Sequence, residues 1–313
     1  MEAYNLRKLL ILTILVVLNS TFGCRAARDV YDVSTQAADS ITGLILPDGK
    51  PILKKKVLLA PVINRGDIST SMAEEIRQEC VSYLSTDEYV VVNTLKQLND
   101  SDPEFIQKQY GAVINPVYVK KAAEMGMNIL TVFIVHPFEI TKKRTGIWPL
   151  RKDTHRVLLS VSVNAVDTVN GTLIVNKNKS VNIDFGETNP GDMENWAPDY
   201  NIIKNKISSL TKDLSSSVIE GLRKAPWQSQ VAIDGDNLVI KAGKETGINE
   251  NTVFELFKKG EPLESFSGEE YFVFGEKIGE TRVKYLSGDK AVLAGSTNGY
   301  FRDTAFARVK RKD

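Results

Sequence analysis

The run Val57-Leu58-Leu59-Ala60-Pro61-Val62-Ile63 decides the fold. It is short and apolar at successive positions, as in a strand that a sheet buries on both faces. A helical pattern follows it and continues to Leu84, with Asp67 or Ser69 as the capping residue. A buried strand that leads directly into a helix indicates an α/β domain.

The next segments continue this alternation. We expect a strand at Tyr89–Val92 and then a second helix, in which Asn115 caps, Pro116 takes the first helical position and Gly126 terminates. The apolar run Ile129–Val135 is typical of another buried strand. The order of elements therefore favours a sheet covered by helices.

Two further strands and a long helix complete this domain. Phe138–Thr141 extends the preceding strand, and Val157–Val169 alternates apolar and polar residues. Asn170-Gly171 predicts a type I′ turn, in which both central positions have positive φ, and Thr172–Phe185 returns as the partner strand. One apolar stripe then predicts the closing helix: Ile203, Ile207, Leu210, Leu214, Val218 and Leu222.

Pro226 ends that helix, and the composition changes after it. Short strands alternate there with turn signals, which are Asp234-Gly235, Gly247, Gly268 and Ser287-Gly288. The predicted fold class is therefore an α/β (α+β) sandwich domain at residues 53–224, followed by a small all-β, barrel-like domain at residues 226–313.

The N-terminus has the pattern of an export signal. Arg7 and Lys8 precede an apolar run, Leu9–Leu18, that is too short for the roughly 20 residues of a membrane-spanning helix. Residues 1–23 therefore read as a signal peptide and residues 24–52 as a tether. Gly23-Cys24 resembles the lipobox of bacterial lipoproteins, which implies acylation of Cys24, and the alternative is removal by ordinary signal peptidase.

Charge argues against nucleic acid as a partner. The chain has 40 basic and 39 acidic residues, and loss of the signal peptide removes Arg7, Lys8 and Glu2, so the remaining chain is formally neutral. Nucleic-acid binders usually carry a strong basic excess. The second cysteine, Cys80, falls on the apolar face of the first helix, and we expect it in the core.

Two stretches of the first domain resemble the N-terminal domains of curli-secretion (CsgG-like) and TolB proteins. They are Val57–Pro61 with the helix behind it, and Ala122–Leu130, in which a helix end, a glycine, a polar residue and a strand follow one another. The resemblance implies a periplasmic α/β module. A CsgG-like secretion-pore subunit is the alternative function, although the chain lacks the long amphipathic hairpins with which curli-type pores cross the outer membrane.

The second domain resembles the C-terminal domain of the flagellar assembly protein T family. The resemblance is carried by Pro226-Trp227, Val231, Val239-Ile240, Ala242-Gly243, Thr246-Gly247-Ile248, Val253-Phe254 and Lys277–Val283. Together the two resemblances imply an assembly or stabilising role in the envelope, in the flagellar basal body or another outer-membrane machine. They imply partners among envelope proteins or copies of this chain, on the periplasmic side of an outer membrane.

The residues predict neither an enzyme nor a cofactor. His136 and His155 have no second histidine or cysteine at ligand spacing beside them, so we expect no metal site. No glycine-flanked nucleophilic serine occurs, which makes an envelope hydrolase the least favoured function.

The loop Lys142–Arg156 is the candidate interaction surface. Its basic residues include Arg144, Arg151 and Lys152, and they surround the apolar tip Ile147–Leu150 with Trp148 at its centre. Aromatic residues beside arginine are favoured as anchors in interfaces. The alternative to an interaction surface is a solvated hairpin tip whose tryptophan folds back on its own sheet. In the interface interpretation, a neighbouring subunit of a homo-oligomeric ring offers a complementary acidic patch, because a neutral chain with separated charge blocks can associate head to tail. That patch comprises Asp184, Glu187, Asp192, Glu194 and Asp199.

Overall fold

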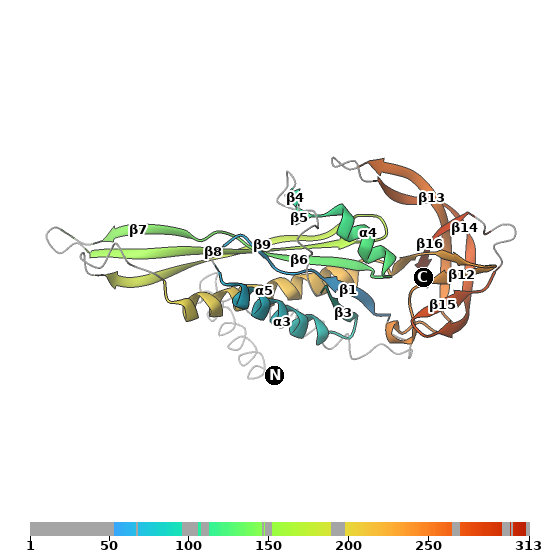
Figure 1. The fold of residues 1–313 in the computed structure, drawn as a ribbon, viewed down its shortest axis with the longest axis horizontal. Coiled ribbons are helices and arrows are strands. Elements are labelled where there is room, and N and C mark those ends of the chain that lie inside the picture. Colours follow the sequence, from blue (N-terminus) through green and yellow to red (C-terminus); the bar gives the residue numbers. More distant parts are fainter. Residues whose placement is uncertain are drawn as a thin grey trace, which may run out of the picture. The chain divides into compact units, whose positions relative to one another are not determined.

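Two β-sheets organise the protein in the computed structural model (Figure 1). The structure describes residues 53–66, 68–95, 106–107, 113–145, 147, 152–188, 198–264, 270–295, 301 and 303–310. The predicted fold class is confirmed, because a mixed α/β domain precedes a nearly closed antiparallel β domain. The predicted signal peptide, the tether and Cys24 lie outside the described residues.

The first sheet has a parallel half and an antiparallel half. Its strands are β1 (Lys55–Leu59), β2 (Ile63–Asn64), β3 (Val90–Thr94), β6 (Ile129–Val135), β7 (Glu139–Thr145), β8 (Lys152–Asp167) and β9 (Leu173–Thr188). β1 lies between β3 and β6 and is parallel to both. β6 and β7 pair in succession with one side of β8, and β9 pairs with the other side. A separate small hairpin joins β4 (Ile106–Gln107) to β5 (Val113–Ile114).

Helices cover both faces of this sheet (Figure 1). α3 (Thr70–Ser85) and α5 (Tyr200–Lys224) pack against one face, where Val57, Leu59 and Phe133 point. α4 (Pro116–Glu124) covers the other face, over Leu58 and Leu130. Because side chains alternate along a strand, an apolar run such as β1 serves two cores at once. No helix within the described ranges is long and apolar enough to cross a membrane.

The predicted helix signals are confirmed at specific atoms. Of the two predicted capping residues, Ser69 caps α3, because its Oγ accepts a hydrogen bond from the Met72 N–H at 3.2 Å, and Asp67 lies outside the described residues. Asn115 caps α4 in the same way, accepting from the Val117 N–H, with Pro116 at the first position. All six residues of the predicted α5 stripe are buried.

The hairpin between β8 and β9 is present, but the predicted type I′ turn is wrong. Among the described residues only glycines have positive φ, so Asn170 cannot occupy a type I′ position. The loop is wider: the Gly171 N–H donates to the Asp167 carbonyl at 2.9 Å, and Gly171 alone takes a φ of +70°. Asp167 Oδ1 accepts from the Val169 N–H at 2.8 Å, and this side-chain bond organises the wider turn.

The second sheet closes through one interrupted strand. Its strands are β10 (Gln228–Gln230), β11 (Ala232–Asp234), β12 (Asn237–Ile240), β13 (Val253–Glu264), β14 (Glu270–Ser287), β15 (Lys290–Leu293) and β16 (Thr304–Val309). β10 pairs with β16 and β11 pairs with β12, while the intervening Val231 N–H donates to the Ala305 carbonyl. The two ends of the strand order are therefore consecutive in sequence, which closes the barrel-like sheet.

Glycines turn the corners of this sheet as predicted. Gly235 and Gly288 adopt positive φ in the β11–β12 and β14–β15 hairpins, and Gly247 does so after a 3₁₀ turn (Lys244–Thr246). The predicted turn at Gly268 lies outside the described residues. β14 begins at Glu270, earlier than the predicted start at Ile278, because register shifts along β13 let the two long strands stay paired.

Candidate interaction surface and domain junction

The predicted interaction loop is shorter than its sequence indicates. Lys142 pairs with His155 and Thr145 pairs with Lys152, so most of the stretch Lys142–Arg156 forms β7 and the start of β8. The prediction of a long loop is wrong because edge strands accommodate basic side chains that point into water. β7, β8 and β9 run on beyond the helices at this end (Figure 1).

The candidate anchor residues are only partly described. Arg144 lies in β7 and is exposed, and Lys152 starts β8. Trp148 and Arg151 lie outside the described residues. Ile147, beside them in sequence, is 84% exposed, which places an apolar side chain of the tip in water. Function as an interaction surface stays a prediction.

The acidic patch is already engaged within the chain where it is described. Asp184 Oδ1 accepts from Arg156 Nε at 2.7 Å across β8 and β9. Asp199 caps α5 by accepting from the Asn201 N–H. Asp192, Glu194 and the side chain of Glu187 lie outside the described residues.

The histidines and Cys80 occupy structural positions. His136 Nε2 lies 2.6 Å from Ser162 Oγ, and burial, with Arg65 nearby, lowers the pKa of His136. His155 is buried in β8. Cys80 is fully buried in the α3 face as predicted, and burial raises the pKa of its thiol. Within the described ranges, no three His, Cys, Asp or Glu side chains gather closely enough to hold a metal ion.

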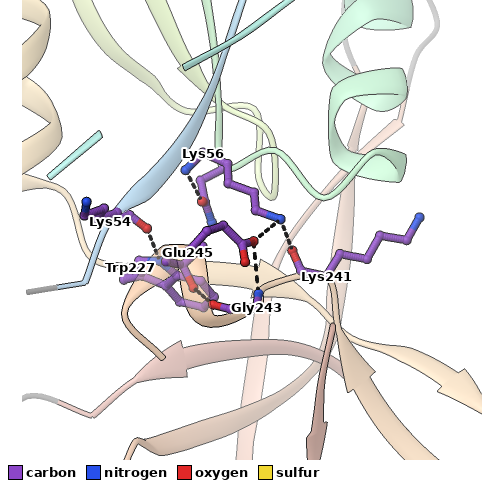
Figure 2. A network of polar contacts seen from close by, with 8 residues as sticks. Lys54, Lys56, Trp227, Lys241, Gly243 and Glu245 are labelled. Atoms are coloured by element: carbon purple, nitrogen blue, oxygen red, sulfur yellow. Dashed lines mark hydrogen bonds and ion pairs between the residues drawn. The ribbon is translucent and has the colours of Figure 1, made fainter. Parts of the chain in front are cut away.

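A polar junction links the start of β1 to the barrel-like domain (Figure 2). The backbone of Lys54 bonds at both ends: its N–H donates to the Thr246 carbonyl at 2.8 Å, and its carbonyl accepts from Trp227 Nε1 at 3.0 Å. Lys56 Nζ contacts Glu245 Oε1 at 2.8 Å and donates to the Lys241 carbonyl at 3.3 Å. One short segment of the first domain therefore carries successive bonds to the second.

Glu245 remains charged in this junction. Burial raises the pKa of Glu245, but hydrogen bonds from Lys56 and from the backbone N–H groups of Glu245 and Gly243 outweigh it, so the net pKa is lowered. The Lys56 side chain is only 8% exposed, and the Glu245 carboxylate forms an ion pair with its ammonium group.

A second chain of hydrogen bonds also links the first domain to the barrel-like domain. Asn128 Oδ1 accepts from the Lys56 N–H at 2.7 Å, and Asn128 Nδ2 donates to the Gln228 carbonyl at 2.7 Å. Gln228 Nε2 then donates to Asp167 Oδ2 at 2.8 Å. Burial raises the pKa of Asp167 to about 6, against the lowering effect of the bonds from Val169 and Gln228. All of these side chains are buried, so each bond replaces one to water.

Lys55 ties the end of α5 into the same region. Its Nζ donates to the carbonyls of Leu222 at 2.5 Å and Ala225 at 2.8 Å. These are carbonyls at the C-terminal end of the helix, where a cation is favoured by the helix dipole. The position at which the chain leaves α5 for the barrel-like domain is therefore held by β1.

The sequence analysis did not identify this junction. The available signal was Lys55-Lys56 at the start of an otherwise apolar strand, since charged residues in a buried strand require partners.

Comparisons with known proteins do not identify a family for this chain. No family model and no curated protein matches the chain. The solved structures that match include the hypothetical protein CT253 from Chlamydia trachomatis, with a TM-score of 0.32, 11% identity, and coverage of 54% of this chain and 98% of that one.

Two further matches are of the same quality. PelC from Paraburkholderia phytofirmans, solved as a dodecamer, has a TM-score of 0.31 and 12% identity, covering 55% of this chain and 90% of that one. Lipoprotein GNA1162 from Neisseria meningitidis has a TM-score of 0.28 and 16% identity, covering 55% of this chain and 99% of that one. With TM-scores below 0.5, these likenesses carry no conclusion about function.

Proposed function

We propose that this chain is an exported lipoprotein of the bacterial envelope with a non-catalytic assembly or stabilising role. The observation that carries the proposal is the N-terminal order of a basic pair, a short apolar run and Gly23-Cys24, ahead of a two-domain body. The lipid on Cys24 holds the protein on the periplasmic side of the outer membrane. Its partners are copies of itself or other envelope proteins.

The machine it serves is a finer part of this proposal. The residues that resemble the flagellar assembly protein T family support a place in the flagellar basal body. The opening strand and Ala122–Leu130 support a CsgG-like secretion pore as the second candidate. Loss of motility on deletion of the gene, with fibre secretion unchanged, would favour the flagellar role.

Acylation of Cys24 is the first test. We expect a fatty-acid analogue to label the wild-type protein and Cys24→Ser to remain unlabelled and to appear in the soluble periplasm. Cys80→Ser is the matched control for loss of a thiol, and it should keep the label. An unlabelled wild type whose mature N-terminus is Ala26 or Ala27 would refute lipidation.

The basic hairpin tip is the second test. Replacing Trp148 with Ala, together with Arg151→Glu and Lys152→Glu, should weaken self-association or partner capture at least tenfold, because a tip anchor and its charges are lost together. Lys284→Glu with Lys290→Glu makes the same charge change at exposed sites of the second domain and serves as the control. Sedimentation and pull-down unchanged from wild type, at an unchanged melting temperature, would show that the tip is only solvated.

A further inference from the structure

Arg308 lies on the outer face of the barrel-like sheet, among aromatic side chains. β16 points Ala307 into the core of this sheet, so its neighbours Phe306 and Arg308 point to the opposite face. The Arg308 Cζ atom lies 4.5 Å from the centre of the Phe274 ring and 5.2 Å from that of Phe257. These two rings meet edge to face at 5.0 Å, and together they form an aromatic clamp on the guanidinium group.

The backbone that positions the aromatic clamp is irregular. The pairing of β13 with β14 shifts register on both sides of Phe257, and the pairing of β13 with β16 shifts directly after it. Farther along the hairpin, Gly260 and Gly275 lie face to face, since a Cβ on Gly260 would lie 3.1 Å from the Gly275 nitrogen. Bulges redirect side chains and are common beside functional sites. The register shifts therefore account for two rings that converge on one arginine.

Arg308 forms few hydrogen bonds within the protein. Its Nη2 donates to Gln228 Oε1 at 3.5 Å, which is a long bond. Gln228 in turn donates to Asp167, so this carboxylate reaches Arg308 only through the Gln228 amide. Arg308 Nε is buried and has no partner, and Nη1 has none either but is open to solvent. Because a guanidinium group carries five N–H donors, most of its hydrogen-bonding capacity is left for a partner.

The carboxylates on the same face are already paired with lysines. Glu255 lies directly opposite Arg308 in the register of β13 with β16, but it accepts from Lys277 Nζ at 2.6 Å. Glu280 accepts from Lys277 Nζ at 2.9 Å and from Lys310 Nζ at 2.8 Å. The charges of these two lysines and two glutamates balance, and Arg308 adds one positive charge to them.

We propose that Arg308 and the aromatic clamp bind a partner protein through an aspartate or glutamate of that partner. The carboxylate pairs with the N–H edge of the guanidinium group, and an apolar side chain beside it packs on the rings. Stacking covers the faces of a guanidinium group but leaves its edge, which matches the geometry of a carboxylate. Arginine and aromatic residues are also the side chains that dominate binding at interfaces. The inference rests on the proposed role in assembly and names a surface and a partner chemistry for it.

The charges on this face favour a carboxylate over a phosphate group. One guanidinium group balances the single charge of a carboxylate, whereas a phosphate monoester carries nearly two charges. Glu255 and Glu280 would repel the second charge, since their carboxylates stand on the same face. Recognition of anionic lipid headgroups usually needs a cluster of lysines and arginines. A protein is therefore favoured over a lipid surface as the partner.

Binding of a small acidic probe to the full chain tests the site. The probe is an acetylated and amidated phenylalanine–glutamate dipeptide, and the phenylalanine–glutamine dipeptide is its neutral control. The protein carries Cys24→Ser, so the result does not depend on acylation. We expect the NMR signal of the Arg308 Nε–H, assigned by its absence in Arg308→Lys, to shift saturably with the glutamate dipeptide. The dissociation constant of the glutamine dipeptide should be about tenfold larger.

Variants measured by titration calorimetry identify the residue that binds. Arg308→Lys keeps the charge but loses the planar edge, so the dissociation constant of the glutamate dipeptide should rise about tenfold. Arg308→Gln should abolish the preference for glutamate over glutamine. Arg282→Gln removes another exposed arginine of β14 and should leave both constants unchanged. The ratio of the two constants is the readout, because a merely structural effect would change both alike.

Three outcomes would overturn the inference. They are equal affinity for the two dipeptides, an unchanged preference in Arg308→Gln, and binding to phosphatidylglycerol vesicles that depends on Arg308 when the dipeptides do not bind. The last would assign the site to a lipid headgroup. None of them touches lipidation of Cys24, which fatty-acid labelling tests separately.

Cross-linking in cells tests the site with the natural partner. Gln230 is exposed and pairs with Phe306, so a photo-activatable benzoylphenylalanine at position 230 lies on the same face as Arg308. The captured segment should contain an aspartate or glutamate, and Arg308→Glu should abolish the capture. Replacing that acidic residue of the partner with arginine should restore it, because the charges are then exchanged. Capture that persists in Arg308→Glu, or that the exchange does not restore, would contradict the proposed contact.

Discussion

Asp167 shows how one residue can serve two parts of the fold. Oδ1 accepts from the Val169 N–H and shapes the β8–β9 turn, while Oδ2 accepts from Gln228 of the second domain. Its side chain is buried, and burial raises the pKa to about 6 from an ordinary value of 3.8. The folded state therefore binds the Asp167 proton more tightly than the unfolded state does.

This pKa predicts the sign of a pH effect on stability. A raised carboxyl pKa contributes most to stability below pH 4, and that contribution falls as the pH rises from about 4 to about 6. Asp167→Asn removes the ionisation, so the free energy of unfolding of the variant relative to wild type should rise by on the order of 2–3 kcal/mol between pH 4 and pH 7.

Urea unfolding of both proteins at a series of pH values measures this difference. Asp213→Asn, which removes an exposed carboxylate of α5, is the control for the loss of a charge away from the junction. A wild-type minus Asp167→Asn difference that does not change with pH would contradict the prediction.

At the scale of elements, the end of α4 meets the barrel-like domain at Gly126. Gly126 has a φ of +78°, as the terminating residue of a helix commonly does, and Met125 is the last capping position before it. A Cβ at Gly126 would clash with the Lys241 side chain and lie 3.0 Å from the Lys241 carbonyl. Lys241 Nζ also donates to the Glu124 carbonyl at the same helix end.

Gly126→Ala should therefore lower the free energy of unfolding by more than the strained backbone conformation alone would. We expect a loss of about 2–4 kcal/mol in the free energy of unfolding, from the left-handed conformation together with the crowding against Lys241. Gly235→Ala is the matched control, because its φ is +58° and nothing lies within 4 Å of an added Cβ, and it should cost about 1 kcal/mol. Equal losses in the two variants, measured by urea unfolding, would mean that the contact with Lys241 is not rigid.

At the scale of the molecule, the two sheets share one junction. Leu53 packs on the core of the second sheet, although the strand that follows it belongs to the first. Residues 52–313 form one compact unit. The predicted division at Pro226 falls between α5 and β10, and whether the two sides fold alone stays a prediction.

We expect the full chain to unfold in one cooperative thermal transition, because unfolding either sheet exposes buried groups of the other at the junction. The fragments 53–224 and 226–313 should each fold, with melting temperatures below that of the full chain, since each loses the bonds around Asn128 and Trp227. Circular dichroism of the three proteins measures this. Two separate transitions in the full chain would show that the junction does not couple the sheets, and failure of both fragments to fold would show that the boundary is wrong.

Local patterns predicted much of this fold. The α3 cap, Pro116 and Gly126 of α4, and the α5 stripe depend on residues close in sequence, so each could be identified without the rest of the molecule. Two local predictions were wrong. The prediction of a long loop at Lys142–Arg156 failed because most of that stretch pairs as strands. The prediction of a type I′ turn at Asn170-Gly171 failed because the Asp167 side chain organises a wider turn.

The sequence by itself determined the order of the elements, the α/β domain followed by the β domain, and the core position of Cys80, because periodicity and capping are properties of neighbouring residues. The tertiary structure alone decided the junction, which joins Lys54–Lys56 to Asn128, Asp167 and the segment from Trp227 to Thr246. The physical reason is that buried polar groups and strand edges find their partners across long separations in the chain, where no local pattern records the pairing.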